Sequence, residues 1–340
     1  MTDAPMTSGA AAPSGEDPDR AAHAALVADL VGRIEEAIVG QRDVVELLLD
    51  AVAARGHVLL DDVPGVAKTL LARTFAAASG LQFARIQFTP DLMPADVTGA
   101  SVWNRTSNTI EFRPGPVFAN VVLADEINRA PAKTQSALLE AMAEGQVTVD
   151  GTTHLLPDPF IVIATQNPID HDGTYALPEA QLDRFAVSTS MGYPGADGEA
   201  EVVRRHLSRA GAAPVTAAVA VPGSDPVSAL RAHVDGVDVH DAVIDYAVRI
   251  VEATRDDGAV RLGSSPRGSL ALITLARARA ARLGRGHVLP DDVKAVSSAC
   301  LGHRISVSPE LWIDGVGGDD VVRRLVELVP APSPDELLGS

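Results

Sequence analysis

The sequence predicts an α/β domain built on a parallel sheet, followed by a smaller, all-helical domain. Over residues 57–190, short and continuously apolar segments alternate with helical patterns, which is typical of a parallel sheet covered on both faces. From residue 195 onward, apolar residues recur mainly with helical spacing. A chain of 340 residues has room for both domains.

Composition narrows the class of protein and of partner. The formal net charge of −17 argues against sequence-independent binding to nucleic acid, because such binding needs clustered Lys and Arg. One cluster of arginines, which we interpret as a solvated helix face, consists of Arg277, Arg279, Arg282 and Arg285. No segment reaches the ~18 apolar residues of a membrane span, and the amino-terminal residues do not resemble a signal peptide. We therefore expect a cytoplasmic protein without a membrane span or a nucleic-acid partner.

Cys300 is the single cysteine of the chain. A single cysteine excludes an intrachain disulfide and any multi-cysteine metal site. Because Cys300 lies in an apolar helical segment, we expect it to be a small core residue rather than a nucleophile.

The first domain is expected to contain the following elements. Helices are predicted over residues 20–38, 41–54, 68–79 and 131–144, and strands over residues 57–61, 83–88, 120–126, 160–165 and 186–190. Two hairpins are predicted, one pairing residues 101–103 with 109–112 and one over residues 146–155 that turns at Asp150 and Gly151. The first hairpin lies within an irregular excursion, residues 89–118, of a kind that is usually functional or partner-facing.

The second domain is expected to be a small helical bundle. Its predicted helices, with one that precedes it, cover residues 195–210, 227–234, 240–255, 266–283, 290–301 and 319–328. The predicted organisation is a disordered tail (1–19), an α/β domain (20–212), a linker (213–223), a helical domain (224–330) and a second tail (331–340).

The chain is organised around a strand that leads through a turn into a helix. The turn and helix start consist of Asp62, Val63, Pro64, Gly65, Val66, Ala67, Lys68, Thr69 and Leu70. The phosphate-loop pattern G-x-x-x-x-G-K-[ST] is met only by Lys68 and Thr69, because Asp62 and Ala67 replace its glycines. Taken alone, the segment fits a phosphate site and an ordinary strand–turn–helix with an exposed lysine equally well.

Polar residues at two further strand ends favour the phosphate site. Asp125 and Glu126 follow one apolar strand, and Gln166 and Asn167 follow another. In a parallel sheet, ligands bind beyond the carboxyl ends of the strands. Asp125 would hold Mg²⁺ through its water shell together with Thr69, and Glu126 would orient or deprotonate a water. The alternative is an acidic pair that stabilises the start of the next helix.

Four segments resemble the MoxR family of AAA+ ATPases, the AAA-3 type. They read ADEINRAPAKTQSALLEAM (residues 124–142), IATQNP (163–168), LPEAQLDRF (177–185) and GSSPR (263–267). Their order also agrees with the family, and the resemblance extends from about residue 34 to residue 328. It implies a P-loop AAA+ domain followed by an all-helical lid.

The resemblance implies roles for three further side chains. Asn167 matches the sensor-1 position beside the γ-phosphate and the catalytic water; otherwise it would cap a strand end. Arg184 matches the arginine finger, which reaches the site of the neighbouring subunit; otherwise it would be a surface arginine. Arg267 matches sensor 2, which the lid carries back onto the nucleotide of its own subunit; otherwise it would be a solvated first-turn residue.

The resemblance also assigns the base-binding segment and the two hairpins. Val39, Gly40 and Gln41 match the segment that lines the adenine pocket. Residues 146–155 match the hairpin that precedes sensor 1, and residues 89–118 match an insert that relates the family to magnesium-chelatase ATPase subunits. Asp62 departs from the pattern, and either its side chain points away from the phosphates or nucleotide binding is weak.

The function implied by the resemblance is hydrolysis of ATP with Mg²⁺ in sites shared between the subunits of a ring, which we expect to be a hexamer. The energy would drive chaperone-like remodelling or activation of a client protein. The client would be a separate polypeptide, often one with a von Willebrand factor A domain. Two alternatives stay open: a magnesium-chelatase-like ATPase subunit, and a nucleotide-switched binding module with little turnover.

Overall fold

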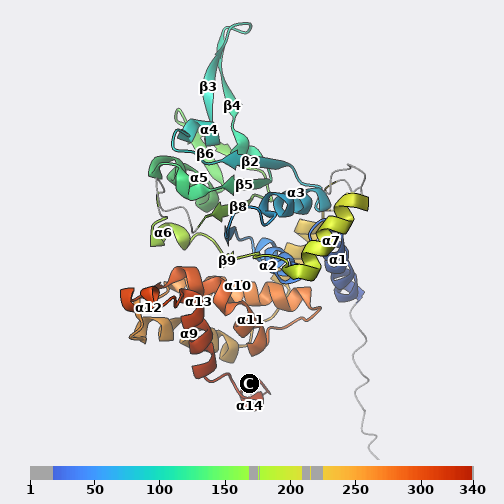
Figure 1. Cartoon of the computed structure of the whole chain (residues 1–340), viewed down its shortest axis with the longest axis vertical. Coiled ribbons are helices and arrows are strands. Elements are labelled where there is room, and N and C mark those ends of the chain that lie inside the picture. Colours follow the sequence, from blue (N-terminus) through green and yellow to red (C-terminus); the bar gives the residue numbers. More distant parts are fainter. Residues whose placement is uncertain (1–17, 168–174, 176, 209–214, 216–224, 339–340) are drawn as a thin grey trace, which may run out of the picture.

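A five-stranded parallel sheet forms the centre of the first domain (Figure 1). The computed structural model describes residues 18–167, 175, 177–208, 215 and 225–338. The strands follow the order β2-β5-β8-β1-β9. Their bounds are β1 (Val58–Asp61), β2 (Phe83–Gln87), β5 (Val121–Asp125), β8 (Ile161–Gln166) and β9 (Val187–Thr189). Each predicted strand of the sheet is confirmed, and every neighbouring pair is parallel.

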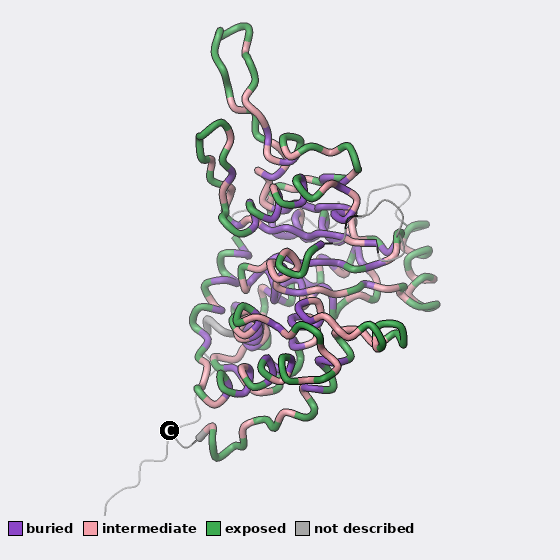
Figure 2. The backbone as a smooth tube through the Cα atoms, turned by 90° about the vertical axis from the view of Figure 1, so that its left-hand side faces the viewer, coloured by how far each residue is buried: buried purple, intermediate pink, exposed green. Residues whose placement is uncertain are grey.

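Helices cover both faces of the sheet, which explains why its central strands are apolar throughout. Leu60, Leu123 and Ile163 belong to one buried cluster, with α1 (Pro18–Glu35), α2 (Arg42–Ala53) and α3 (Lys68–Ala78). Val122 and Val162 point to the opposite face, where they join the cluster that includes α5 (Ala132–Glu144). Successive residues of a strand therefore pack into different hydrophobic clusters, one on each face of the sheet, so that both faces are covered. Figure 2 shows this buried centre.

Two hairpins project from this domain, as predicted (Figure 1). β3 (Gly99–Asn104) pairs with β4 (Thr109–Pro114), and β6 (Gln146–Val149) pairs with β7 (Thr152–Leu155). The rings of Phe112 and His154 stack at 3.9 Å between centroids and join the two hairpins. A groove of 590 Å³ lies between the hairpins, and Trp103 on its wall is 56% exposed.

The second domain is helical, as predicted. Its larger helices are α8 (Pro226–Asp235), α9 (Asp241–Asp256), α10 (Pro266–Arg282), α11 (Pro290–Leu301) and α13 (Gly318–Leu328). The sequence did not predict a small antiparallel ribbon of β10 (Val260–Leu262) and β11 (Ser306–Val307). The remaining short elements are α4 (Pro94–Thr98), α6 (Glu179–Leu182), α12 (Pro309–Ile313), α14 (Pro334–Leu338), η1 (Pro116–Phe118), η2 (Ile127–Arg129) and η4 (Gly302–Arg304). Between the two domains, α7 (Gly195–Ser208) follows the sheet.

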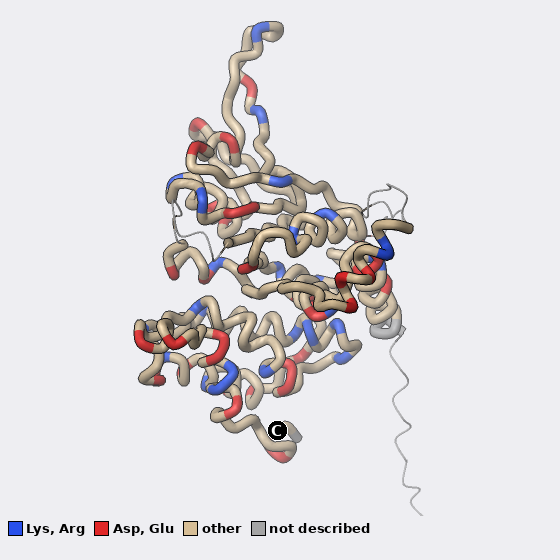
Figure 3. Tube along the Cα trace, viewed as in Figure 1, with Lys and Arg blue, Asp and Glu red and all other residues tan. Residues whose placement is uncertain are grey.

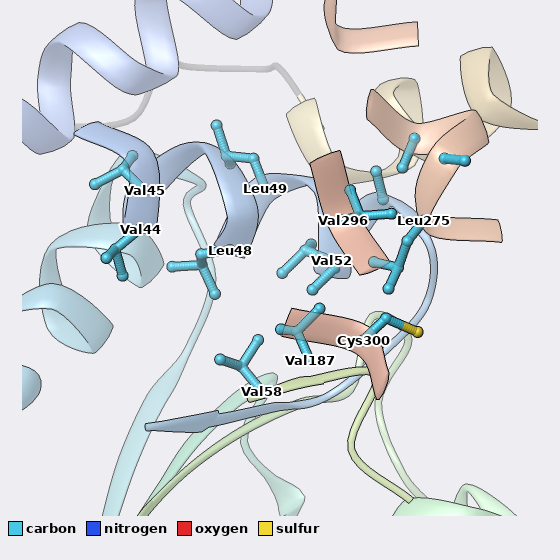
Figure 4. Packing of buried hydrophobic residues seen from close by; sticks show 14 of the residues in the cluster. Val44, Val45, Leu48, Leu49, Val52, Val58, Val187, Leu275, Val296 and Cys300 are labelled. Atoms are coloured by element: carbon cyan, nitrogen blue, oxygen red, sulfur yellow. The ribbon is translucent and has the colours of Figure 1, made fainter. Parts of the chain in front are cut away.

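The two domains share one hydrophobic core. Val52 on α2 belongs to the same buried cluster as Leu275 on α10 and Cys300 on α11 (Figure 4). Cys300 is fully buried, as predicted, and burial raises the pKa of its thiol to about 11. The lid is therefore packed against the sheet domain in this structure.

The prediction of a solvated arginine face on α10 is wrong. The Arg282 side chain is 9% exposed, and it binds Asp50 at 2.8 Å and Glu46 at 2.6 Å, both on α2. Arg285 donates to Asp292 at 2.6 Å, and Arg277 donates to two backbone carbonyl groups. Arg279 lies 3.5 Å from the same Asp292. The Arg282 side chain joins α10 to α2, whose Asp50 lies 232 positions away in the sequence, a distance that local spacing does not reveal.

Several predictions lie outside the described residues: nearly all of the amino-terminal tail (1–19), all of the linker (213–223) except residue 215, and the last two residues of the helix at 195–210. Within the described chain, no helix is long and apolar enough to cross a membrane. Lys and Arg are interspersed with Asp and Glu along both domains (Figure 3). The absence of a nucleic-acid partner stays a prediction.

Candidate functional site

The loop between β1 and α3 has the backbone geometry of an anion site. Gly65 and Ala67 both have positive φ angles, +91° and +66°, and α3 begins at Lys68. The Lys68 Nζ donates to the Asp62 carbonyl oxygen at 2.7 Å, which closes the loop. The N–H groups that begin α3 have no partners within the helix, and their dipole favours negative charge. The loop therefore suits a polyphosphate.

The Asp62 carboxylate points away from this loop. It is buried, and it accepts hydrogen bonds from the backbone N–H groups of Met191 and Gly192, the latter at 3.1 Å. Of the two alternatives that the sequence left open, the structure shows the first. The carboxylate joins the loop to the segment that follows β9.

An apolar cavity of 400 Å³ adjoins the loop. It is lined by both the predicted base-binding segment and the loop: Val39, Gln41, Gly65, Val66 and Ala67. Tyr193, which follows β9, lines the same cavity and was missed from the sequence. Gly40 instead lines a second cavity of 700 Å³ between α2 and the lid helices α10 and α11. A cavity of 400 Å³ is within the range of small-molecule sites.

Asp125 and Glu126 lie at the carboxyl end of β5, as predicted. The Asp125 Oδ1 accepts a hydrogen bond from the Thr165 hydroxyl at 2.7 Å, and its Oδ2 accepts from Arg85 at 2.6 Å. Glu126 has a φ of +56°, and its backbone N–H donates to the Thr165 Oγ1 at 2.8 Å. Thr165 was missed, although a hydroxyl within an otherwise apolar strand was a signal that the strand end was special.

The Glu126 carboxylate has partners of its own. Its Oε2 accepts a hydrogen bond from the Gln87 side chain at 2.8 Å and lies 3.3 Å from the Arg129 Nε. Gln87 is paired with Asp125 in the register of β2 and β5. The sequence did not point to Gln87 or Arg85, because polar residues on an edge strand usually face solvent.

Lys68 places a positive charge beside the phosphate loop. Burial lowers the pKa of Lys68, and the charges of Asp62, Asp125, Asp61 and Glu126 oppose this effect. Since carboxylates act on this lysine from two strand ends, the phosphate loop and the carboxylate pair form one electrostatic unit.

The oxygen donors of this unit suit Mg²⁺. The Thr69 hydroxyl and the Asp125 carboxylate are hard oxygen ligands, which Mg²⁺ prefers. Among the described residues, no group of three or more His, Cys, Asp or Glu side chains could hold a metal by itself. Mg²⁺ usually keeps several waters and needs only one or two protein groups besides substrate phosphates.

Asn167 lies beside the phosphate loop. It directly follows β8, the neighbour of β1, and it is 7% exposed. The backbone N–H of Asp62 donates to the Gln166 carbonyl at 3.2 Å, which joins the two strand ends. The structure thus brings Asn167, Lys68 and the carboxylate pair together at the carboxyl ends of the strands.

Arg184 and Arg267 lie near the amino ends of the strands, opposite the phosphate loop. Arg184 precedes β9, which runs parallel to β1, whereas the phosphate loop follows β1. The Ser265 hydroxyl donates to Asp183 at 3.0 Å, so the start of α10 lies beside Arg184. In Figure 1, α6 and α3 lie on opposite sides of the molecule.

The sequence led us to expect that the lid carries Arg267 back onto the phosphate loop of its own chain. In this structure it does not. Arg267 is exposed at the start of α10, and the 17 residues of that helix lead away over about 25 Å to Arg282, which contacts α2. The Nε of Arg184 is buried and has no hydrogen-bond partner within the described parts of the chain. Both arginines therefore lie near the amino end of β9, whereas the phosphate loop follows the carboxyl end of β1.

A five-stranded parallel sheet with a phosphate loop, a carboxylate pair two strands away and a helical lid defines a P-loop ATPase of the AAA+ class. Comparison with known proteins agrees. The profile of the ATPase family associated with various cellular activities (AAA) matches residues 57–187, and that of an AAA lid domain matches residues 252–325.

Relatives identify the family within this class. The chain is 46% identical to the uncharacterized protein YeaC of Bacillus subtilis over 90% of its own length and 95% of that protein. It is 41% identical to the chaperone MoxR1 of Mycobacterium tuberculosis over 94% of its own length and 86% of that protein. A crystal structure of a candidate ATPase from Cytophaga hutchinsonii superposes with a TM-score of 0.84 at 36% identity, covering 93% of this chain and 98% of the other. The chain belongs to the MoxR family of AAA+ ATPases.

Proposed function

We propose that this protein binds and hydrolyses ATP at sites shared by neighbouring subunits of a ring, and uses the energy to remodel or activate client proteins. One observation supports a shared site. Arg184 lies near the amino ends of the strands, whereas Lys68 of the same chain lies beyond their carboxyl ends. A second copy that presents the amino ends of its strands to the phosphate loop would supply positive charge where the transition state needs it.

Within one subunit, the loop amides and Lys68 would hold the phosphates in place. Glu126 would orient the attacking water or accept its proton, and Asn167 would lie between that water and the γ-phosphate. When bound near Thr69 and Asp125, Mg²⁺ would neutralise charge on the phosphate oxygens. Tyr193, Val39 and Gln41 would enclose the base in the apolar cavity.

From the neighbouring subunit, Arg184 would stabilise the charge of the transferred phosphoryl group. Arg267 would enter the same site, because Ser265 attaches the start of α10 to Asp183 beside Arg184. Hydrolysis would then depend on assembly, and the lid of one subunit would respond to the nucleotide of the next.

The chaperone role rests on the family and on the relative named a chaperone. We propose a separate client polypeptide, for which a von Willebrand factor A domain protein is the expected class. The hexameric ring and the cytoplasmic location stay predictions. So does the chelatase-subunit alternative, which co-purification with a large chelatase subunit would favour. The binding-module alternative also stays a prediction; the Asp62 carboxylate, which motivated it, accepts hydrogen bonds from the backbone N–H groups of Met191 and Gly192.

Release of inorganic phosphate from ATP and Mg²⁺ tests the proposal. We expect steady turnover by the wild-type protein and a loss of about 100-fold or more in Glu126→Gln, since the carboxylate acts as the base. Glu140→Gln, which changes an exposed glutamate on α5, serves as the matched control and should keep the wild-type rate. Equal rates for wild-type and Glu126→Gln protein would contradict the proposal.

A further inference from the structure

Arg85 contacts both the metal-binding carboxylate and a second side chain of its own strand. Arg85 and Gln87 are two residues apart on β2, so their side chains stand on the same face of the sheet. The Arg85 Nε and Nη2 donate to the Asp125 Oδ2 at 3.0 and 2.6 Å. The same Nη2 also donates to the Gln87 Oε1 at 2.6 Å.

The contact with Gln87 extends the connection to the second carboxylate. The Gln87 amide accepts through its oxygen from Arg85 and donates through its nitrogen to the Glu126 Oε2 at 2.8 Å. An amide bound at both ends in this way has one orientation, because its oxygen cannot donate and its nitrogen cannot accept. A continuous chain of hydrogen bonds therefore runs from Asp125 through Arg85 and Gln87 to Glu126.

The contact between Arg85 and Asp125 is sensitive, for electrostatic reasons, to a cation at Asp125. The Arg85 side chain is 47% exposed, whereas that of Asp125 is 12% exposed, so the arginine can leave more easily than the carboxylate. A divalent cation near Asp125 would repel the guanidinium and compete for the same carboxylate oxygen. The Thr165 hydroxyl holds the other oxygen and would not be repelled.

We propose that Arg85, which Gln87 helps to hold in place, is a positioning residue that competes with Mg²⁺ for the Asp125 carboxylate. This inference rests on the proposed function. Without the ion, Arg85 holds Asp125 and fixes the Gln87 amide, which holds the Glu126 carboxylate. With the ion, Arg85 releases Asp125 and the Gln87 amide loses its anchor.

The test is the Mg²⁺ concentration at half-maximal binding of a fluorescent, non-hydrolysable ATP analogue, measured on the full chain. Arg85→Gln should lower this midpoint about three- to tenfold, because one competing positive charge is removed. Arg85→Lys keeps the charge and should keep the midpoint near the wild-type value. The matched control Arg73→Gln removes an exposed arginine from α3 and should leave the midpoint unchanged. Circular dichroism confirms that each variant is folded.

A double-mutant cycle tests the coupling through Gln87. Gln87→Ala alone should also lower the midpoint, because it removes one of the contacts that hold Arg85 in place. In the Arg85→Gln background the same change should have no further effect, since the guanidinium that Gln87 holds is already absent. Strictly additive shifts would overturn the coupling.

The direction in which the Mg²⁺ midpoint shifts distinguishes the proposed competition from a purely structural role of Arg85. A residue that only supports the site would raise the midpoint when it is removed, and an unchanged or raised midpoint in Arg85→Gln therefore overturns the inference. If the wild-type protein binds the analogue but its midpoint does not respond to Arg85, only this inference fails. If the wild-type protein binds no analogue at any Mg²⁺ concentration, the proposed function fails as well.

Discussion

Asp62 accepts hydrogen bonds from the backbone N–H of Gly192 through both carboxylate oxygens, at 3.3 Å to Oδ1 and 3.1 Å to Oδ2. The residue that breaks the phosphate-loop pattern thus joins the loop to the chain beyond β9. Because that chain supplies Tyr193 to the apolar cavity, Asp62 helps to shape the pocket beside the loop.

Replacing Asp62 should therefore affect stability more than nucleotide affinity. Asp62→Gly should lower the free energy of unfolding by about 1–3 kcal/mol, because the buried N–H of Met191 and the half-buried N–H of Gly192 lose their acceptor. Asp62→Asn keeps one acceptor oxygen and should lose less. Urea unfolding measures the stability, and binding of a fluorescent ATP analogue measures the affinity. A tenfold tighter affinity in Asp62→Gly would mean that the carboxylate does repel the phosphates.

Ala67 directly precedes α3 and has a positive φ, a conformation that costs a residue with a Cβ about 1 kcal/mol or more. Ala67→Gly should raise the free energy of unfolding by about 0.5–1 kcal/mol, after allowance for the greater freedom of glycine in the unfolded chain. Ala77→Gly, in the same helix, is the matched control and should lower stability by up to about 1 kcal/mol. Equal losses in both variants would contradict the assigned backbone conformation.

The Asp50–Arg282 pair that joins α2 to the lid should give a loss of stability that depends on pH. Arg282→Met leaves the Asp50 carboxylate buried without its partner, which should cost about 3 kcal/mol at pH 8. Burial raises the pKa of Asp50 from 3.8 to about 6 against the effect of Arg282, and the variant should raise it further.

The sign of this pH dependence follows from proton binding. A carboxyl group with a raised pKa binds more protons in the folded than in the unfolded state, so its contribution to stability falls as pH rises through the window from about 4 to above 6. The cost of Arg282→Met should therefore be smaller at pH 5 than at pH 8, as measured by urea unfolding. A cost that is the same at both values would show that Asp50 is not desolvated.

The Cys300 thiol should be unreactive in the folded protein. Its pKa is raised to about 11 by burial, and only the thiolate reacts with a disulfide reagent such as DTNB. We expect labelling to follow unfolding: slow in buffer, and complete once urea has unfolded the chain. Rapid, stoichiometric labelling in buffer would place Cys300 outside the shared core.

The sequence predicted the parallel sheet, both hairpins and the helices of the lid because each depends on a local pattern. Apolar strands such as Val121–Asp125 need helices on both faces of the sheet. The turn at Asp150 and Gly151 has two positive φ angles, which few residue types other than Gly, Asn and Asp adopt. The residues at the carboxyl ends of the strands could be predicted for the same reason, since parallel strands bring their ends together.

What the sequence did not predict depends on contacts between distant segments. Arg282 was interpreted as solvated because its partner Asp50 lies 232 positions away. Arg267 was assigned to its own nucleotide because the residue type matched, although the position of the lid decides which site it can reach. Arg85 and Gln87 were missed because the pairing of β2 with β5 gives them their partners.

The shared site is the central claim, and a mixture of two inactive variants tests it most directly. Glu126→Gln removes the base from its own site, and Arg184→Ala removes the arginine that would enter the neighbouring site. If the two variants exchange subunits at random, roughly a quarter of the sites contain both intact groups. We predict that the mixture recovers about that fraction of wild-type phosphate release. No recovery in rings shown by native mass spectrometry to be mixed would contradict a site that joins Glu126 of one subunit to Arg184 of the next.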